Sequence, residues 1–154
     1  MPVVDASVVV DWVAPDVDAR APARRLLSNL VADGADLAAP RLLMEEVGNA
    51  LLTGVRRARW DGAAADAAFG LLRSLPISLR DEPRDLDRAW DLSRRHDEHP
   101  LYDMVYVALA ERLHQQLITA DEKLRSRLTG LGFVDSPVNL AGRLGLMDGP
   151  QATN

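Results

Sequence analysis

Two carboxylates of this sequence stand next to apolar segments that are suited to a protein core. Asp5 lies between the apolar runs Val3-Val4 and Val8-Val9-Val10. Asp121 follows the apolar segment Leu117-Ile118-Thr119 by two residues. A carboxylate in such a place is costly to bury unless another group pairs with it. Both positions therefore need a partner that the local sequence does not supply.

A third acid, Glu46, lies in a segment with helical periodicity, residues 41–57. At 100° per residue, Glu46 falls roughly 85° from the centre of the apolar stripe and Glu45 roughly 175° from it. We therefore expect Glu45 to face solvent and Glu46 to lie at the boundary, where its side chain reaches a cleft. Asn49, almost one turn further on, could orient Glu46.

The fourth acid, Asp103, lies in the first turn of an apolar helical segment, residues 101–115. We expect a buried stripe along this helix, with Asp103 beside it. The residues expected in the stripe are Tyr102, Tyr106, Leu109 and Leu113.

Each acid also has a purely structural explanation. Asp5 and Asp121 stand where helix N-caps stand, and N-caps are often Asp. The helix dipole favours an acid such as Asp103 in a first turn, and Glu46 could be an ordinary surface residue. Four acids at one edge of a sheet would nevertheless repel one another, and divalent cations remove that repulsion. Mg²⁺ and Mn²⁺ prefer carboxylate and water oxygens, so the set as a whole favours a metal site.

Short apolar strands alternate with amphipathic helices along the chain. The predicted strands are residues 2–4, 37–39, 77–79, 117–119 and 132–134. The predicted helices are residues 7–13, 18–32, 41–57, 61–74, 84–95, 101–115, 122–128 and 138–144. This alternation predicts an α/β fold with a parallel sheet covered by helices on both faces. Ligands of such folds gather at the carboxyl ends of the strands, where Asp5 and Asp121 are expected.

The composition is that of one globular domain. The chain has 154 residues, of which 47% are hydrophobic and 27% charged, and it contains no cysteine. Disulfides and thiolate zinc sites are thereby excluded. We see no signal peptide and no membrane-spanning run, and expect a cytoplasmic protein with no membrane partner. The net charge of −5 argues against nucleic-acid binding, but acids that hold cations would present a less negative surface when loaded.

Four segments give the chain a resemblance to PIN-domain ribonucleases, and most closely to VapC-type toxins of type II toxin–antitoxin pairs. The segments are VVDASVVVDW at 3–12, PRLLMEEVGNAL at 40–51, LYDMVYVALA at 101–110 and LITADEKL at 117–124. They occur in the family's order, and each has its acid in the expected place.

This resemblance implies a set of functional residues and partners. It implies that Asp5, Glu46, Asp103 and Asp121 are catalytic and hold one or two Mg²⁺ or Mn²⁺ ions. Ser7, Asn49 and Thr119 match supporting positions of the family. The expected fold is a three-layer α/β/α PIN-like domain over residues 1–146, with a disordered tail at 147–154. The expected partners are an RNA substrate, a cognate antitoxin and a second copy of the chain, with a dimer of toxin–antitoxin pairs as a further possibility.

Several other residues are weaker candidates. The basic residues that could hold an RNA backbone are Arg56, Arg57, Arg59, Lys123 and Arg125, although any one of them could equally lie on a solvated helix face. The aromatic side chains of Trp12, Trp60 and Trp90 could stack on bases, although their apolar surroundings favour packing. The cluster His96-Asp97-Glu98-His99 could bind a transition metal, but a solvated loop between two helices explains it better.

Three other functions stay open on the sequence alone. The first is a catalytically silent PIN-like module that binds proteins. The second is a metal-dependent nuclease or phosphatase with a substrate other than RNA, since four acids do not specify RNA. The third is a receiver-like signalling domain, which the sequence disfavours because Arg80 separates the segment Ile77–Leu79 from Asp81.

Overall fold

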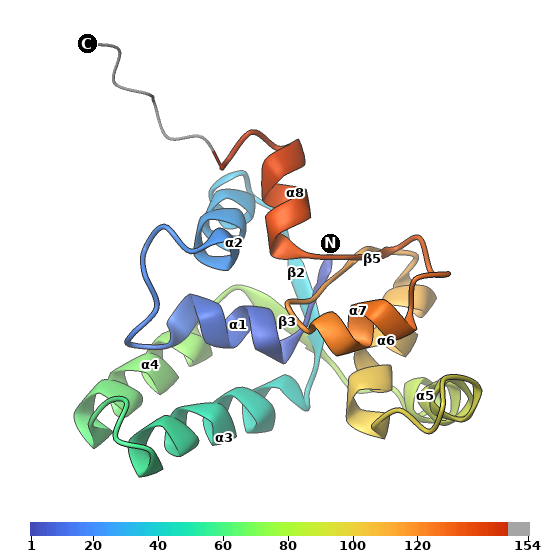
Figure 1. The fold of residues 1–154 in the computed structure, drawn as a ribbon, viewed down its shortest axis with the longest axis horizontal. Helices are drawn as coiled ribbons and strands as arrows, with labels where there is room; N and C mark the ends of the chain where they lie inside the picture. Colours follow the sequence, from blue (N-terminus) through green and yellow to red (C-terminus); the bar gives the residue numbers. More distant parts are fainter. Residues whose placement is uncertain (148–154) are drawn as a thin grey trace.

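Five short strands form one parallel sheet at the centre of the computed structural model, which describes residues 1–147 (Figure 1). The strands are β1 (Val3–Val4), β2 (Leu37–Pro40), β3 (Ile77–Arg80), β4 (Leu117–Ile118) and β5 (Val134–Asp135). Their order across the sheet is β3-β2-β1-β4-β5, and neighbouring strands are parallel. Because parallel strands share one carboxyl edge, Asp5 after β1 and Asp121 after β4 lie on the same edge.

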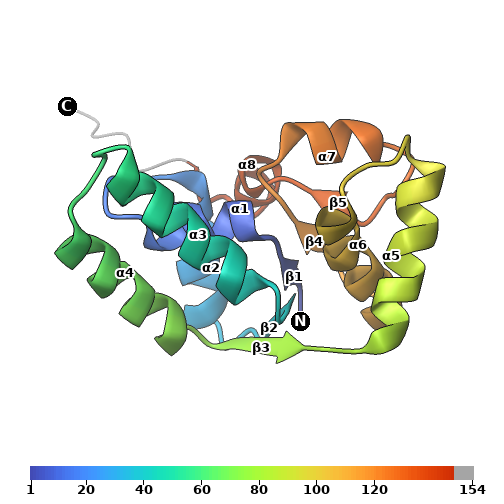
Figure 2. The same cartoon turned by 90° about the horizontal axis from the view of Figure 1, so that it is seen from below.

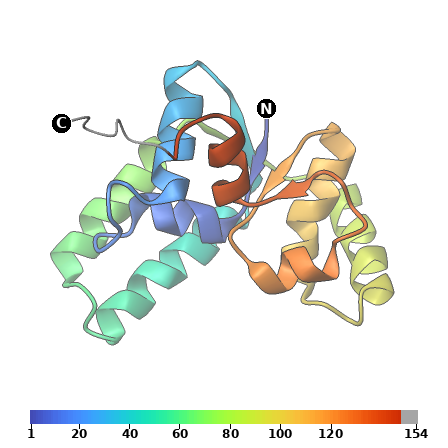
Figure 3. The ribbon, with the colours of Figure 1, turned by 45° about the horizontal axis from the view of Figure 1, so that its top comes forward.

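Helices cover both faces of this sheet. They are α1 (Ala6–Val13), α2 (Pro22–Ala32), α3 (Leu43–Arg56), α4 (Gly62–Ser74), α5 (Pro83–Arg95), α6 (Leu101–Leu113), α7 (Glu122–Arg127) and α8 (Pro137–Arg143). Figure 2 shows α1 to α4 on one side of the sheet and α5 and α6 on the other. Helix α8 packs against α2 (Figure 3). These layers confirm the predicted three-layer α/β/α architecture.

The predicted helix bounds differ from the observed ones where local turn chemistry intervenes. The helix predicted from residue 18 begins at Pro22, because the Asp18 side chain accepts a hydrogen bond from the backbone N–H of Arg20 (2.7 Å) and forms a turn there. The helix predicted to reach residue 115 ends at Leu113, because His114 has a left-handed backbone (φ 51°). Of the predicted tail, all but Met147 lies outside the described residues. Every helix within residues 1–147 is too short or too polar to cross a lipid bilayer.

Helix α6 lies at the centre of the core and packs against β1, β2 and β4. Its middle is buried on all sides, since the residues from Tyr106 to Ala110 are all buried. The predicted single stripe is wrong for Tyr102, whose side chain is 52% exposed. Tyr102 lies in the first turn of α6, which extends beyond the core. Its side chain is therefore exposed although it lies on the apolar stripe of the helix.

Two bidentate ion pairs fasten α6 to α5. Arg112 donates to both carboxylate oxygens of Asp85, at 2.6 and 2.8 Å, and Arg88 does the same with Glu111, at 2.6 and 2.7 Å. Asp85 is buried, so its paired charge leaves little freedom for the two helices to slide. This fixes the position from which α6 presents Asp103.

Candidate active site

Asp5 is a buried carboxylate whose contacts come from hydroxyl groups. Its side chain receives two hydrogen bonds on the same oxygen, Oδ2, from Ser7 Oγ (2.6 Å) and Thr119 Oγ1 (2.7 Å). The two hydroxyls in turn accept from backbone N–H groups beyond β4, Ser7 from Ala120 (3.0 Å) and Thr119 from Asp121 (3.1 Å). The network joins the end of β1 to the end of β4 and leaves Asp5 Oδ1 outside these hydroxyl contacts.

Helix capping does not explain Asp5. It occupies the N-cap position of α1, but its side chain makes no capping hydrogen bond. Burial raises the pKa of Asp5, and the hydrogen bonds from Ser7 and Thr119 oppose that rise. Among the ion pairs of residues 1–147, none involves Asp5. The negative charge on Asp5 is therefore held by neutral donors alone.

Glu46 is held by a tyrosine from the core. It lies half-buried in the first turn of α3, while Glu45 beside it is exposed, as the helical geometry predicted. The buried Tyr106 hydroxyl donates to Glu46 Oε2 at 2.5 Å. Burial raises the pKa of Glu46 to about 7, and the negative charges of Asp5 and Asp103 add to the rise while the tyrosine opposes it. Asn49 does not take the orienting role, since it is exposed and lines a surface hollow between α3 and α4.

Asp103 is held by a histidine. His99 Nε2 lies 2.8 Å from Asp103 Oδ2, and the histidine side chain is only 9% exposed. Burial raises the pKa of Asp103, as do the negative charges of Asp5 and Asp121, whereas the hydrogen bond from His99 lowers it. Asp103 lies in the first turn of α6.

Asp121 is the one acid for which capping explains part of its position. Its Oδ1 accepts from the backbone N–H groups of Lys123 (2.8 Å) and Leu124 (3.0 Å), which caps α7. The cap fixes the rotamer of Asp121 and leaves Oδ2 outside the capping bonds. The negative charge of Asp121 raises the pKa of both Asp5 and Asp103.

The four acids lie at the N-terminal ends of α1, α3, α6 and α7. These helix ends converge on the carboxyl edge of the sheet (Figure 1). Although the chain has 18 Lys and Arg residues, no ion pair within residues 1–147 joins any of them to these four acids. As the side chains lie, no three acidic or histidine side chains in this part of the chain are close enough to hold one ion. The arrangement is an anionic site of four separate carboxylates, of which only Asp103 has a basic partner, His99.

The predicted RNA-contacting residues fall into two groups. Arg56, Arg57 and Arg59 lie at and beyond the C-terminal end of α3, away from α6 and α7 (Figure 1). Of these, Arg59 is engaged in an ion pair with Asp16 (2.7 Å) and stacks on Trp60.

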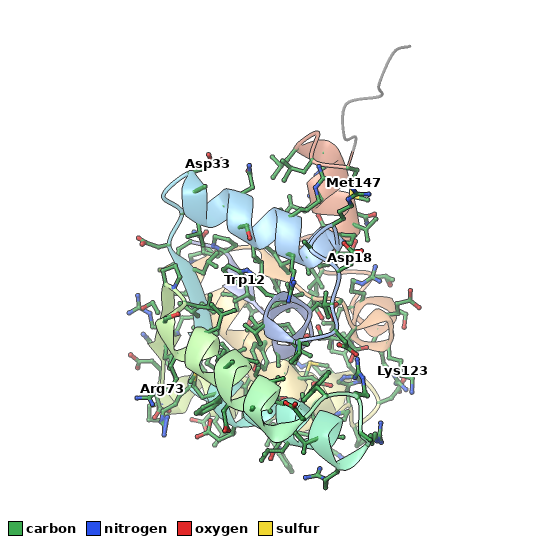
Figure 4. The ribbon with its side chains drawn as sticks, turned by 90° about the vertical axis from the view of Figure 1, so that its left-hand side faces the viewer. Trp12, Asp18, Asp33, Arg73, Lys123 and Met147 are labelled. Atoms are coloured by element: carbon green, nitrogen blue, oxygen red, sulfur yellow. The ribbon has the colours of Figure 1, made fainter. Side chains whose placement is uncertain are left out.

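Lys123 and Arg125 belong to α7, directly after Asp121, and line a surface hollow of about 580 Å³. Lys123 projects from the edge of the molecule (Figure 4). The structure thus brings only the α7 residues near the four acids.

The weaker candidates of the sequence, the three tryptophans and the His96–His99 cluster, lie mostly in packing contacts and ion pairs. Trp12 and Trp60 are half-buried against the core, and only Trp90 is largely exposed, at 60%. In the cluster, Asp97 and Glu98 pair with arginines on α7 and α5, and His99 turns toward Asp103.

Sequence reasoning missed two side chains of this site, His99 and Tyr106. Tyr106 was assigned to the core, and its hydroxyl could have been noticed because a buried tyrosine usually needs a hydrogen-bond partner. His99 lies four residues before Asp103, a spacing that would have pointed to contact if the helix had been extended to residue 99. The turn that actually brings the two together is not visible in the sequence.

A parallel five-stranded α/β/α domain with acids gathered at its carboxyl edge is the architecture of the PIN domain, and the PIN domain family model matches residues 3–127. The chain belongs to this family. Within it, the chain belongs with the VapC group. Ribonuclease VapC1 of Mycobacterium tuberculosis is 35% identical over 126 residues, which is 79% of this chain and 86% of the relative. Ribonuclease VapC3 of the same organism is 34% identical over 122 residues, covering 79% and 83%.

Solved structures show the same fold. PAE2754 from Pyrobaculum aerophilum superposes with a TM-score of 0.67 at 26% identity, over 93% of this chain and 95% of that one. VapC20 of Mycobacterium tuberculosis, a toxin that cleaves the sarcin–ricin loop, superposes with a TM-score of 0.63 at 20% identity, over 87% and 97% of the two chains. The likeness to VapC20 concerns the fold alone.

Proposed function

We propose that this protein is a metal-dependent endoribonuclease that acts as the toxin of a toxin–antitoxin pair. The observation that carries the proposal is the buried carboxylate of Asp5, surrounded by three further acids and held by neutral donors only. A stable protein can keep such a charge if a cation completes the site. The ribonucleases VapC1 and VapC3, to which the chain is similar, support RNA as the substrate.

The four acids suit a hard divalent cation. Their donors are carboxylate oxygens, which Mg²⁺ and Mn²⁺ prefer. Asp5, Glu46, Asp103 and Asp121 would hold one or two such ions. Without a cation the four like charges repel one another, so we expect their side chains to draw closer when an ion binds. One carboxylate oxygen of Asp5, of Glu46 and of Asp103 is held by a hydrogen bond from a protein side chain. The movement is therefore limited to the other oxygen of each carboxylate.

The chemistry is hydrolysis of a phosphodiester bond. A divalent cation held by carboxylates lowers the pKa of bound water and stabilises charge on the phosphate. The protein residues orient and restrain the reacting groups. Ser7 and Thr119 fix one oxygen of Asp5, Tyr106 fixes one oxygen of Glu46, and the α7 cap fixes one oxygen of Asp121. Lys123 and Arg125, which follow Asp121 on α7, would contact phosphates of the RNA backbone.

Cleavage of total RNA by the wild-type protein and by Asp5→Asn tests the proposal. Each protein is assayed with Mg²⁺, with Mn²⁺ and with EDTA. We expect discrete fragments from the wild type that require the metal and that are absent with Asp5→Asn, whose melting temperature should be unchanged or higher. Equal cleavage by both proteins would refute the role of Asp5.

Two alternative functions are separated by substrate. A nuclease or phosphatase that acts on something other than RNA would use the same acids, so matched RNA and DNA oligonucleotides distinguish it from a ribonuclease. A silent binding module would cleave neither. The presence of all four acids, together with their supporting hydroxyl groups, favours an active enzyme.

The proposed partners are an antitoxin and a second copy of the chain, in the cytoplasm. A surface hollow of about 550 Å³ between α3, α4 and β3 supports the protein contacts, since Leu52, Phe69 and Leu79 line it and are 40% to 56% exposed. Clustered exposed apolar residues mark interaction surfaces. We propose that this hollow is the homodimer face.

A further inference from the structure

The turn between α5 and α6 has a backbone that is unusual for its residues. Asp97 and Glu98 both have positive φ, 55° and 51°, a conformation that side chains other than glycine rarely adopt. The backbone N–H of His99 donates to the carbonyl of His96 at 3.2 Å and closes the turn. Strained backbone next to a functional site is worth a functional hypothesis.

This turn delivers one side chain into the site. His99 is turned inward, with its side chain 9% exposed, and its Nε2 lies 2.8 Å from Asp103 Oδ2. The neighbouring residues of the turn point outward, where Asp97 pairs with Arg127 on α7 (2.6 Å) and Glu98 pairs with Arg94 on α5 (2.8 Å). The turn is therefore tied to α5 and α7, and His99 is its only side chain that contacts one of the four acids.

We propose that His99 is a positioning residue that orients Asp103 toward a divalent cation, an inference that rests on the proposed metal site. Because a carboxylate oxygen only accepts, His99 Nε2 must carry a proton and donate to Oδ2. Asp103 Oδ1 then remains outside this hydrogen bond and free to bind a cation. Histidine acts here on a ligand of the ion, as partners behind metal ligands do in other proteins.

A different reading is that His99 only fastens the turn to α6. The two readings differ in what a substitution changes. If His99 only fastens the turn, its loss lowers the melting temperature of the metal-free protein and leaves metal affinity intact. If His99 positions Asp103, its loss weakens metal binding more than it weakens the fold.

The test is Mn²⁺ binding by calorimetry, with the melting temperature of each metal-free protein measured in parallel. We expect the dissociation constant of His99→Ala to rise by about tenfold or more, as for other partners of metal ligands. We expect His99→Gln to recover most of the affinity, since its amide nitrogen can donate from nearly the same place. His96→Ala, in the same turn but without a hydrogen bond to any of the four acids, is the matched control and should bind as the wild type does.

An unchanged dissociation constant in folded His99→Ala would overturn the inference. If that variant does not fold, long-range ¹H–¹⁵N spectra of the wild type decide instead. We expect the His99 proton on Nε2, and a ring protonated only on Nδ1 would overturn the inference because it could not donate to Asp103.

Asp103→Asn separates this inference from the proposed function. Loss of Mn²⁺ binding in Asp103→Asn, with normal binding in His99→Ala, would reject the role of His99 and leave the metal site standing. A wild-type protein that binds no Mn²⁺ would reject both.

Discussion

At the scale of single residues, each of the four acids is held by a different kind of donor. Two hydroxyls hold Asp5, a buried tyrosine holds Glu46, a histidine holds Asp103, and backbone N–H groups hold Asp121. Each contact restrains one oxygen of a carboxylate, and none supplies a full positive charge from lysine or arginine. The site is thus ordered in its side chains while its charge stays uncompensated.

This charge predicts how stability depends on pH in the metal-free protein. Folding raises the pKa of Glu46 from its ordinary value of 4.5 to about 7, chiefly through burial. A group whose pKa is raised by folding contributes stability that is present below its unfolded pKa and lost as pH rises through its folded pKa. We therefore expect the melting temperature in EDTA to fall as the pH rises from about 5 to about 8.

Glu46→Gln should reduce that fall, since glutamine does not titrate. Glu45→Gln is the control, because Glu45 is the exposed neighbour in the same helical turn. Thermal melts of the three proteins across this pH range make the comparison. If Glu46→Gln and the wild type show the same pH dependence, Glu46 does not titrate as described.

At the scale of elements, Gly54 of α3 allows the side chain of Trp60, in the loop after the helix, to pack directly on the helix backbone. A Cβ added at Gly54 would overlap the Trp60 indole ring at Cζ2. The indole cannot move away easily, because Trp60 Nε1 donates to the carbonyl of Leu51 at 2.9 Å and Arg59 stacks on its ring. By contrast, a Cβ at Gly48 would lie 3.6 Å from Phe69 Cε2, an ordinary contact.

The two glycines of α3 therefore predict opposite effects of the same substitution. We expect Gly54→Ala to destabilise the protein by about 1–3 kcal/mol through overpacking. Gly48→Ala should stabilise it by up to about 1 kcal/mol, since alanine is the better helix former. Urea unfolding of both variants measures the difference. A Gly54→Ala protein as stable as the wild type would contradict the packing of Trp60 on α3.

The elements themselves were largely predictable from the sequence, and the contacts between them were not. The alternation of apolar strands and amphipathic helices predicts all of the strands and helices described, with bounds that differ by a few residues. The acids could be found because they interrupt apolar segments. Which acids His99 and Tyr106 contact could not be predicted, because Tyr106 reaches Glu46 from another helix and a turn with positive φ brings His99 to Asp103. The error at Tyr102 also comes from packing, since only the middle of α6 is buried on all sides and its first turn leaves the core.

At the scale of the whole molecule, the exposed apolar hollow between α3, α4 and β3 predicts self-association. Substituting Leu52 and Phe69 together by Asp should convert a dimer into a monomer, because charges would have to be buried in the interface. Light scattering of the purified protein gives the mass. Leu86→Asp is the control, since Leu86 is 53% exposed on α5 and lies outside this hollow. A wild-type protein that is monomeric at high concentration would reject this face.

The proposed catalytic site and the proposed protein interface lie at different edges of the sheet. The carboxyl ends of β1 and β4 present the acids, while β3 lies at the margin of the sheet next to the apolar hollow. The catalytic proposal depends on the site first holding a cation, because the four acids would otherwise repel an RNA phosphate.

The position of a bound ion is the most direct test. Crystals soaked in Mn²⁺ and measured at the manganese absorption edge would reveal the metal in an anomalous difference map. We expect a peak among the carboxylates of Asp5, Glu46, Asp103 and Asp121, at the carboxyl edge of the sheet, and no such peak in crystals of Asp5→Asn. A map of the wild type without a peak among these four acids, or with its manganese bound elsewhere, would contradict the proposed metal site.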